Sequence, residues 1–561
     1  MCGILFSLRC APSEGLSCDN HEIEVAFQDL LGKLEIENAA RGPDAQDTVH
    51  VNSSSAHMSF FASELRLRGE SPVVQPHRDD EGNILCWNGE IASEDNDGAY
   101  LFSRLCATWS LEDVRDLLGG IEGPYALVYY HARLQKIIFA RDPLGRRSLL
   151  IHRPTTECPY LLLASVSVGV HPGYLPEELP TEHIYALDAN QLRGIPCTSA
   201  VLSKVNRSIP HDPPEVHDLD SIPPHLTSAV DDLLHHLDRS VMLRVRNIPR
   251  VGIREGQARV AVLFSGGIDS TMLAFLAHRH VDPSEPIDLL NVAFENPRKI
   301  SVQIEGNIGA LPKRERKQKM KERLDYSTVN VEYDVPDRLT GAQEVEELRR
   351  LCPGRIWNFV EVNVPYEESQ AARPVVEALM FPCKTVMDLS LAAALYFAAR
   401  GIGQIRSHCG AEPEPYTSPA RVLLNGLGSD ELLGGYGRHR TAFKHAGWQA
   451  IVDELQLELD RIPTRNLGRD DRVISSHGKE TRHPFLSLSV VSFLLQLPVH
   501  LKTDPRLEAG FGEKMLLRLA ARKVGLMEAS VRKKKAMQFG SHSARMVPGA
   551  DFKKGDLLLN P

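Results

Sequence analysis

Cys2 is the residue of this chain that is best placed for nucleophilic chemistry. It directly follows Met1, and removal of that methionine would leave a cysteine with both a thiol and a free α-amine. An α-amine titrates at about 8, so near neutral pH it can accept the proton of its own thiol. One residue would then provide the nucleophile and the general base. Taken alone, a cysteine at position 2 is usually incidental.

Several short motifs follow Cys2 within the first 170 residues or so. In chain order they are Arg41-Gly42-Pro43-Asp44, Arg66-Leu67-Arg68, Asn88-Gly89-Glu90, Asp97 and Arg141-Asp142-Pro143-Leu144-Gly145. Hydrolysis of a glutamine amide by a thiol passes through a tetrahedral oxyanion, which needs preorganised hydrogen-bond donors. With Cys2, this series resembles the class II glutamine amidotransferases, in which an N-terminal cysteine is the nucleophile.

The resemblance implies a role for each motif. The side chain of Asn88 and the N–H of Gly89 would stabilise the oxyanion. Glutamine would be bound by Arg66, Glu90 and Asp97, with the planar guanidinium on the α-carboxylate and Asp97 on the α-ammonium. Arg141 and Asp142 are expected to be structural. The alternative is a glutaminase-like fold without activity.

A second motif, SGGIDS at 265–270, lies between a segment that predicts a strand, VAVLF, and one that predicts a helix, STMLAFLAHR. Gly266 and Gly267 let the backbone approach an anion, and the helix N-terminus offers free N–H groups. Ser265 and Ser270 add hydroxyl donors. The segment lacks the ending of a Walker loop. In this context it resembles the pyrophosphate loop of enzymes that split ATP into AMP and pyrophosphate.

Two carboxylates are candidates for a Mg²⁺ site beside ATP. Asp269 is the carboxylate of the SGGIDS loop, and Asp430 lies in the glycine-rich turn NGLGSDELLGGY. Mg²⁺ on ATP phosphates uses one or two protein carboxylates and keeps its waters. Parallel sheets bind ligands at the carboxyl ends of strands. We therefore expect Leu263, Val292, Asn425 and Gly426 to contact the nucleotide. Leu263 and Val292, at the ends of two predicted strands, would do so through their backbone atoms.

Together these motifs resemble the glutamine-dependent asparagine synthetases, whose second motif reads LSGxGxDExxGGY. The segments RNLGRDDRVI at 465–474, GRIWNFVEVNV at 354–364 and VPDRLTG at 335–341 resemble the asparagine synthetase domain-containing proteins. The resemblance implies glutamine, ATP with Mg²⁺ and a carboxylic acid such as aspartate as ligands. Lys514 would stabilise charge on a phosphate or carboxylate. The alternative for Lys514 is a surface lysine at the start of a helix.

The chain departs from asparagine synthetases at Leu427, where they place a glutamate. Leucine cannot accept a proton or orient ammonia, so asparagine synthesis is impaired or the acceptor differs. The first interpretation is a two-site amidotransferase that carries ammonia from Cys2 to an acyl-AMP. The second is a catalytically degenerate nucleotide-binding scaffold. A ring-forming relative of the β-lactam synthetase type ranks last, because ring closure needs no glutamine.

The secondary structure that must position these residues is predicted to differ between the N-terminal and C-terminal parts of the chain. Short β-like runs such as ILCWNGEI and YALVYYHA dominate residues 1–205 and predict packed antiparallel sheets. Prolines at 206–226 predict a linker. In residues 227–561, DDLLHHLDRSVMLRV predicts an amphipathic helix, and a strand, a glycine turn and a helix follow it, as in α/β domains. The resemblance implies an N-terminal nucleophile glutaminase domain (an αββα sandwich, α+β) followed by an α/β parallel-sheet ATP-pyrophosphatase domain.

Composition narrows the function classes. The 561 residues carry a net charge of −9, from 73 acidic and 64 basic side chains, which disfavours a nucleic-acid partner. No stretch approaches the about 18 apolar residues of a membrane-spanning helix, and no signal peptide is apparent. The ten cysteines lack metal-ligand spacing, so a cytoplasmic protein is expected. The irregular, basic segment 296–325 favours a solvated insertion. The oligomeric state stays open.

Overall fold

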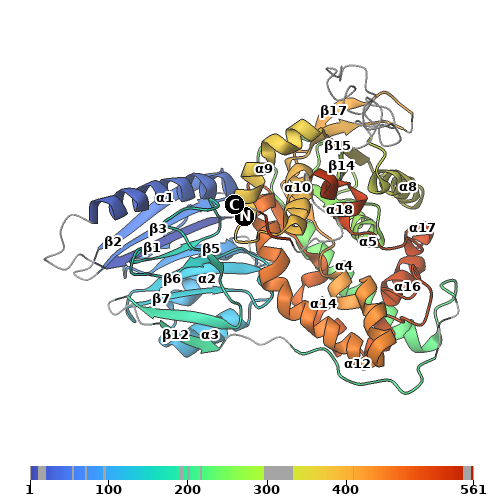
Figure 1. Cartoon of the computed structure of the whole chain (residues 1–561), viewed down its shortest axis with the longest axis horizontal. Coiled ribbons are helices and arrows are strands. Elements are labelled where there is room, and N and C mark those ends of the chain that lie inside the picture. Colours follow the sequence, from blue (N-terminus) through green and yellow to red (C-terminus); the bar gives the residue numbers. More distant parts are fainter. Residues whose placement is uncertain are drawn as a thin grey trace, which may run out of the picture.

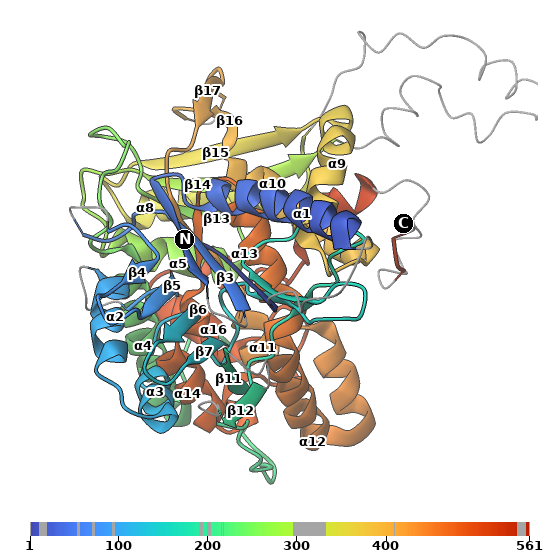
Figure 2. The same cartoon turned by 90° about the vertical axis from the view of Figure 1, so that its left-hand side faces the viewer.

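The computed structural model of the protein describes most of the chain. The described residues are 2–10, 20–52, 56–69, 73–91, 96–189, 194–198, 203–214, 216, 218–295, 333–408, 410–546 and 557–559. The expected basic insertion at 296–325 lies outside the described residues. Figure 1 and Figure 2 show two halves of mixed α/β structure that contact each other along one face.

The first half contains two six-stranded antiparallel sheets, as the β-like runs predict. One sheet has the order β10-β8-β9-β1-β3-β2, with β1 Gly3–Cys10, β2 Ala45–Asn52, β3 Ala56–Glu64, β8 Leu150–His152, β9 Tyr160–Ala164 and β10 Glu177–Glu178. The other has the order β12-β11-β7-β6-β5-β4, with β4 His77–Arg78, β5 Ile84–Gly89, β6 Tyr125–His131, β7 Lys136–Arg141, β11 His183–Asp188 and β12 Gly194–Thr198.

Helices cover the outer faces of these two sheets. Successive side chains of a strand point to opposite faces, so in β1 Phe6 enters the core between the sheets and Leu5 packs against Leu30 of α1 (Asn20–Arg41). On the other sheet, α2 (Asp97–Cys106) and α3 (Leu111–Gly119) pack against the outer face. The layers therefore run helix, sheet, sheet, helix, at the left of Figure 1.

The second half is built on a seven-stranded sheet of order β17-β16-β15-β14-β13-β18-β19. The strands are β13 Val260–Leu263, β14 Ile287–Phe294, β15 Trp357–Val364, β16 Ile402–Ile405, β17 Glu414–Thr417, β18 Val422–Leu424 and β19 Glu480–Arg482. The five strands β15, β14, β13, β18 and β19 are parallel, and β16 and β17 add an antiparallel edge. Strands β13 and β14 are buried throughout, as expected where helices cover both faces.

Helices flank this sheet. They are α4 Thr227–Val245, α5 Ile268–His278, α8 Pro336–Leu351, α9 Tyr366–Met380, α10 Val386–Arg400, α11 Ser429–Leu433, α12 Gly437–Ile462, α13 Gly468–Ser475, α14 Leu488–Gln496, α15 Val499–Lys502, α16 Met515–Lys523, α17 Met527–Ser530 and α18 Met537–Gly540. Helix α10 begins at a capping box between Thr385 and Asp388 and ends at Gly401, whose φ is 69°. Within the described ranges, none of the helices is long and apolar enough to cross a membrane.

The proline-rich segment after the first half lies along the second half. The backbone N–H of Asn206 donates to the carbonyl of Leu495 at 2.8 Å. Val216 and Leu219 are buried in the hydrophobic core that also contains α4 and α16. Although the prolines keep this segment out of regular structure, its apolar side chains attach it to the second half.

We expect Leu219→Ala to lower the free energy of unfolding by about 2–4 kcal/mol, because it leaves a cavity in a packed core. Urea denaturation measures this value. The matched control is Ile209→Ala in the same segment, where the side chain is 47% exposed and the expected change is within about 0.5 kcal/mol. Equal, small effects of the two substitutions would contradict the packing of this segment.

Candidate active site

Cys2 lies at the start of β1, a central strand of its sheet, and its position is fixed by the neighbouring strands. The N–H of Gly3 donates to Ser63 Oγ at 2.9 Å, and the N–H of Cys2 donates to Asn88 Oδ1 at 3.1 Å. Only 9% of Cys2 is exposed. The expected nucleophile is therefore held between the two sheets by contacts to β3 and β5.

Asn88 is oriented by that contact with Cys2. Because its Oδ1 faces the Cys2 N–H, its Nδ2 is buried and has no hydrogen-bond partner among the described residues. A buried donor without a partner costs about 1–3 kcal/mol. A developing oxyanion beside the Cys2 thiol could accept from this donor.

Gly89 follows on β5, and its lack of a side chain is a packing requirement. A Cβ at this position would lie 2.3 Å from Cζ2 of the Trp87 ring. The glycine therefore keeps the backbone between Trp87 and the cavity beside Cys2, which it lines.

The Cys2 cavity has a volume of about 50 Å³. Of the expected site residues, the structure brings together Cys2, Gly89, Glu90 and Asp97 in its wall. Its other lining residues are Glu64, Leu65, Leu67, Arg68, Val73, Gln75, Trp87, Asn96, Gly98, Glu480 and Arg482. The guanidinium groups in the wall thus belong to Arg68 and Arg482, and Arg66 is not a lining residue. The backbone N–H of Arg66 donates to Asp44 Oδ2 at 2.8 Å.

Burial sets the protonation of the groups in this cavity. It raises the pKa of the Cys2 thiol to about 11, so this thiol needs a base near neutral pH. It also raises the pKa of Asp97 to about 6, although Asp97 accepts from the N–H of Ile91 at 3.0 Å. Burial would raise the pKa of Glu90 too, but Arg482 and Arg68 hold it below its usual value.

Gln75 is a site residue that the sequence did not indicate. Its Nε2 donates to Cys2 Sγ at 3.6 Å, and its Oε1 accepts from the N–H of Trp87 at 2.8 Å. It lies in none of the motifs near Cys2, and only the fold brings it to the thiol. We found no signal in the sequence that would have identified it.

Arg141 and Asp142 stabilise the turn after β7. Arg141 donates to the carbonyls of Arg147 and Gly145 at 2.8 and 2.6 Å. Asp142 accepts from Arg146 Nε at 2.9 Å. Both residues are buried, and neither lines the Cys2 cavity.

A larger cavity of about 350 Å³ lies at the carboxyl ends of β13 and β18. Its wall contains seven of the residues expected to bind nucleotide or metal, which are Leu263, Ser265, Asp269, Ser270, Asn425, Gly426 and Asp430. Val292 is not in the wall, because β14 continues past it to Phe294. The expectation that Val292 ends its strand was therefore wrong.

The SGGIDS loop follows β13 and leads into α5, as the sequence predicts. Gly266 has a φ of 74°, and a Cβ there would lie 2.5 Å from the backbone nitrogen of Gly341 in α8. Thr340 Oγ1 donates to the carbonyl of Ser265 at 3.0 Å. Helix α8 thus packs against the loop. Gly267 is the N-cap residue of α5.

Two ammonium groups contact the two candidate metal carboxylates. Lys514 Nζ lies 2.6 Å from Asp269 Oδ2 and 2.6 Å from Asp430 Oδ1. Lys534 Nζ also pairs with Asp430. Burial would raise the pKa of Asp430, but Lys514 and Lys534 hold it well below its usual value.

Lys534 was missed by sequence reasoning, although it lines the larger cavity and Lys514 does not. The basic run RKKK at 532–535 was visible in the sequence. Its residues alternate between more and less exposed side chains, as an extended segment allows. This alternation, which directs Lys534 inward, is a property of the fold.

The donor set fits Mg²⁺ on a polyphosphate. Mg²⁺ on phosphates uses one or two protein carboxylates. Asp269 and Asp430 supply two carboxylates, and both residues line the larger cavity. The lysine ammonium groups suit phosphate oxygens. The part of the chain that the structure describes contains no group of three or more His, Cys, Asp or Glu residues arranged to hold a metal ion by themselves.

Leu427 also lines the larger cavity, and its N–H donates to Asn425 Oδ1 at 3.0 Å. The remaining carboxylates of the described wall already have partners. These pairs are Asp388 with Arg469, Asp470 with Arg469, Glu431 with Tyr436 and Glu458 with Arg438. No free carboxylate in the described wall takes the place of the glutamate that Leu427 replaces.

The two cavities are separated by one pair of parallel strands. Glu480 and Arg482 of β19 line the Cys2 cavity, and Asn425, directly after β18, lines the larger cavity. The N–H of Asn425 donates to the carbonyl of Arg482 at 2.9 Å. Residues of this strand pair, or directly after it, therefore line both cavities.

Comparison with known proteins agrees with this arrangement of motifs. The family model described as asparagine synthase matches residues 442–550. The chain is 35% identical to "Asparagine synthetase domain-containing protein 1" of Homo sapiens over 95% of both chains. It is 35% identical to the Gallus gallus protein of the same name over 90% of this chain and 93% of that protein.

Among solved structures, a glutamine phosphoribosylpyrophosphate amidotransferase from B. subtilis covers 74% of this chain and 98% of its own, with 12% identity. Its TM-score is 0.27, too low to bear on the fold. The identity to the curated relatives, by contrast, extends over almost the whole of each chain. The chain belongs to the asparagine synthetase domain-containing protein family.

Proposed function

We propose that the protein is a glutamine-dependent amidotransferase of the asparagine synthetase type. The observation that carries this proposal is the placement of two chemically distinct cavities on either side of the β18–β19 pair. One cavity is lined by the buried thiol of Cys2, and the neighbouring Asn88 has a buried Nδ2 without a partner among the described residues. The other holds two carboxylates and a lysine beside a glycine-rich loop.

Glutamine hydrolysis would take place in the Cys2 cavity. With Met1 removed, the α-amine of Cys2 would accept the thiol proton. This base is needed because burial raises the pKa of the thiol. Asn88 Nδ2 and the N–H of Gly89 would donate to the oxyanion. Asp97 would bind the α-ammonium of glutamine, and Arg68 is a cation in the wall for its α-carboxylate. Ammonia and glutamate would be the products.

Carboxylate activation would take place in the larger cavity. ATP would supply the adenylyl group, and Mg²⁺ would neutralise phosphate charge. The backbone of the SGGIDS loop and the N-terminus of α5 would bind the pyrophosphate. Asp269 and Asp430 would hold the cation, while Lys514 and Lys534 would contact phosphate oxygens. Transfer of the adenylyl group to the carboxylate would release pyrophosphate, and attack of ammonia on the resulting acyl-AMP would give the amide and AMP.

The acceptor is proposed to be aspartate or a related carboxylic acid. Leu427 and the paired carboxylates around it favour a second candidate function, a nucleotide-binding protein with a degenerate acceptor site. The test is pyrophosphate release in the presence of glutamine, ATP, Mg²⁺ and a series of carboxylic acids. Release with another acid but not with aspartate would identify that acid as the acceptor and exclude aspartate. No release with any acid, although ATP binds, would favour the scaffold.

We expect Cys2→Ala to lower glutamine-dependent pyrophosphate release by about 10³-fold or more, because it removes the nucleophile. Release supported by ammonium chloride should persist, since ammonia then bypasses the Cys2 cavity. Both rates are measured with the same carboxylic acid. Equal losses with glutamine and ammonium would contradict a role for Cys2 in ammonia supply.

The apparent affinity for glutamine should fall as the pH drops through about 6, where Asp97 becomes protonated. A neutral carboxyl no longer attracts the α-ammonium, so KM rises while kcat changes less. The control, Asp97→Asn, should have a high KM that is independent of pH in this range. A glutamine KM that stays constant from pH 5 to pH 8 (about one unit below and two above this pKa) would disprove the assignment.

Leu427→Glu should raise aspartate-dependent pyrophosphate release by about tenfold or more, if a carboxylate at this position serves as a base or orients ammonia. Leu427→Gln is the matched control, because it has similar size and polarity without the charge. The effect is measured with ammonium chloride to keep the Cys2 cavity out of the comparison. If the glutamate variant shows no gain in aspartate-dependent release, this result would argue against aspartate as the acceptor.

A further inference from the structure

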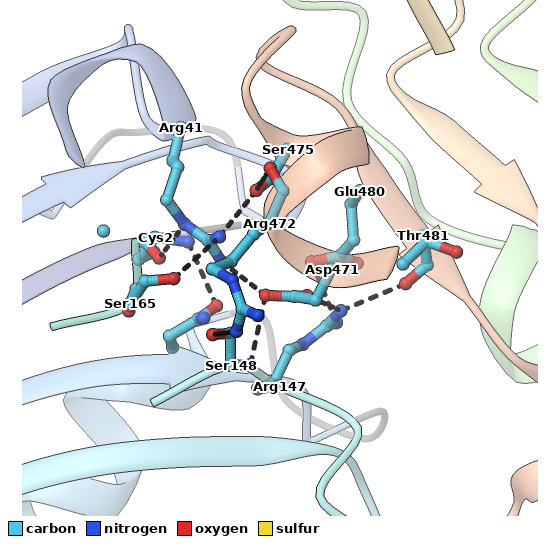
Figure 3. A network of polar contacts seen from close by, with 12 residues as sticks. Cys2, Arg41, Arg147, Ser148, Ser165, Asp471, Arg472, Ser475, Glu480 and Thr481 are labelled. Carbon is cyan, nitrogen blue, oxygen red and sulfur yellow. Dashed lines mark hydrogen bonds and ion pairs between the residues drawn. The ribbon is translucent and has the colours of Figure 1, made fainter. Parts of the chain in front are cut away.

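Helix α13 lines the larger cavity and also contacts the first half of the chain near Cys2. Arg469 and Asp470, in its first turn, are part of the wall of the larger cavity. Asp471, Arg472 and Ser475 of the same helix contact the first half, as Figure 3 shows. Because Asp470 and Asp471 are neighbours in one helical turn, a displacement of the cavity wall is carried to Asp471.

Arg41, at the end of α1, joins Cys2 to this helix. Its Nε donates to the carbonyl of Cys2 at 3.3 Å, its Nη2 pairs with Asp471 Oδ2 at 2.8 Å, and its Nη1 donates to Ser475 Oγ at 2.6 Å. The side chains of Arg41 and Asp471 are 0% exposed. In Figure 3 the guanidinium lies between the Cys2 backbone and α13.

Asp471 is the point on α13 where several groups of the first half meet. It accepts from the N–H of Ser148 at 3.1 Å and faces Arg147 at 3.7 Å in addition to Arg41. Burial would raise its pKa, but Arg41 and Arg147 hold it below its usual value. A buried carboxylate with two guanidinium partners has one favourable position, so Asp471 fixes Arg41.

In the same turn of α13, Arg469 pairs with Asp388 at the N-terminus of α10 and with Asp470. All three residues line the larger cavity. A polyphosphate or metal ion in that cavity would change the field on these charges and reposition the first turn of α13.

We propose that Asp471 is a positioning residue for Cys2, which acts through Arg41 and couples ligand binding in the larger cavity to the reactivity of the thiol. The coupling rests on the proposed function in two respects only, that the larger cavity binds ATP and that Cys2 is the nucleophile. Occupation of the larger cavity orders α13, and Arg41 then holds the Cys2 backbone in place.

Glu178 provides a matched control at the same interface. It pairs with Arg472 of α13 at 2.5 Å and faces Arg141 at 3.3 Å, and its side chain is 5% exposed. Its hydrogen-bond and ion-pair partners in the described structure do not include Arg41 or Cys2. Glu178→Gln therefore removes a buried ion pair between the halves and leaves the connection from Asp471 to Cys2 intact.

The experiment measures alkylation of Cys2 by iodoacetamide in the full chain, with and without ATP and Mg²⁺, from mass spectra of the N-terminal peptide. In the wild type, saturating ATP should change the rate by about fivefold or more. Asp471→Asn should abolish this response, and Glu178→Gln should retain it. Ser475→Ala, which removes one smaller contact of Arg41, should weaken the response and serves if Asp471→Asn does not fold.

The pH profile of alkylation without ATP adds a readout that a merely structural residue would not alter. In Asp471→Asn the guanidinium of Arg41 loses an anionic partner while it stays near Cys2, so it should lower the apparent pKa of the thiol. The Glu178→Gln profile should match the wild type. Identical profiles in all three proteins would overturn the positioning role.

Calorimetric titration with ATP and Mg²⁺ separates the two levels of inference. If the wild type binds ATP but its alkylation rate does not respond, the coupling is overturned and the proposed nucleotide site stands. If Asp471→Asn responds like the wild type, the coupling does not pass through this residue. If the wild type binds no ATP, the proposed function fails and the coupling fails with it.

Discussion

The structure depends on the ion pairs between Asp471 and its two arginine partners, Arg41 and Arg147. These side chains are almost fully buried, and arginine stays charged at any pH at which the protein folds. Removal of one partner by substitution would leave a buried charge without compensation, which costs about 3–5 kcal/mol. The same arginines approach Cys2 and the strand β19 that divides the cavities. The interface therefore determines the geometry of the chemistry.

Charge is balanced in the larger cavity too, where two lysines face two carboxylates. An incoming Mg²⁺ would compete with the ammonium groups for the carboxylates and free them for phosphate. Leu427 introduces no charge into this balance. The charged groups of the proposed phosphate site are thus paired with one another, whereas the proposed acceptor site has the apolar Leu427 where the resemblance to asparagine synthetases implies an acid.

Local patterns predicted what local physics controls. Alternating and continuous apolar runs identified β5, β6, β13 and α5, because strand and helix periods are visible within a few residues. Contacts between distant segments were not visible. Gln75 reaches Cys2, Lys534 reaches Asp430 and Asp471 reaches Arg41 only after the sheets have paired. The place of Arg68 rather than Arg66 in the cavity wall likewise depends on which way a loop residue points.

The glycines of the N-terminal motifs have a further consequence for reading relatives of this chain. A Cβ on Gly3 or Gly42 would lie 2.5 Å from backbone atoms of Asn38 or Glu64, and one on Gly89 would enter the Trp87 ring. Packing alone would preserve these glycines in a homologue that had lost all activity. Retained glycines in a relative thus report a shared fold, whereas changes at Cys2 or at the amide of Asn88 report the fate of the chemistry.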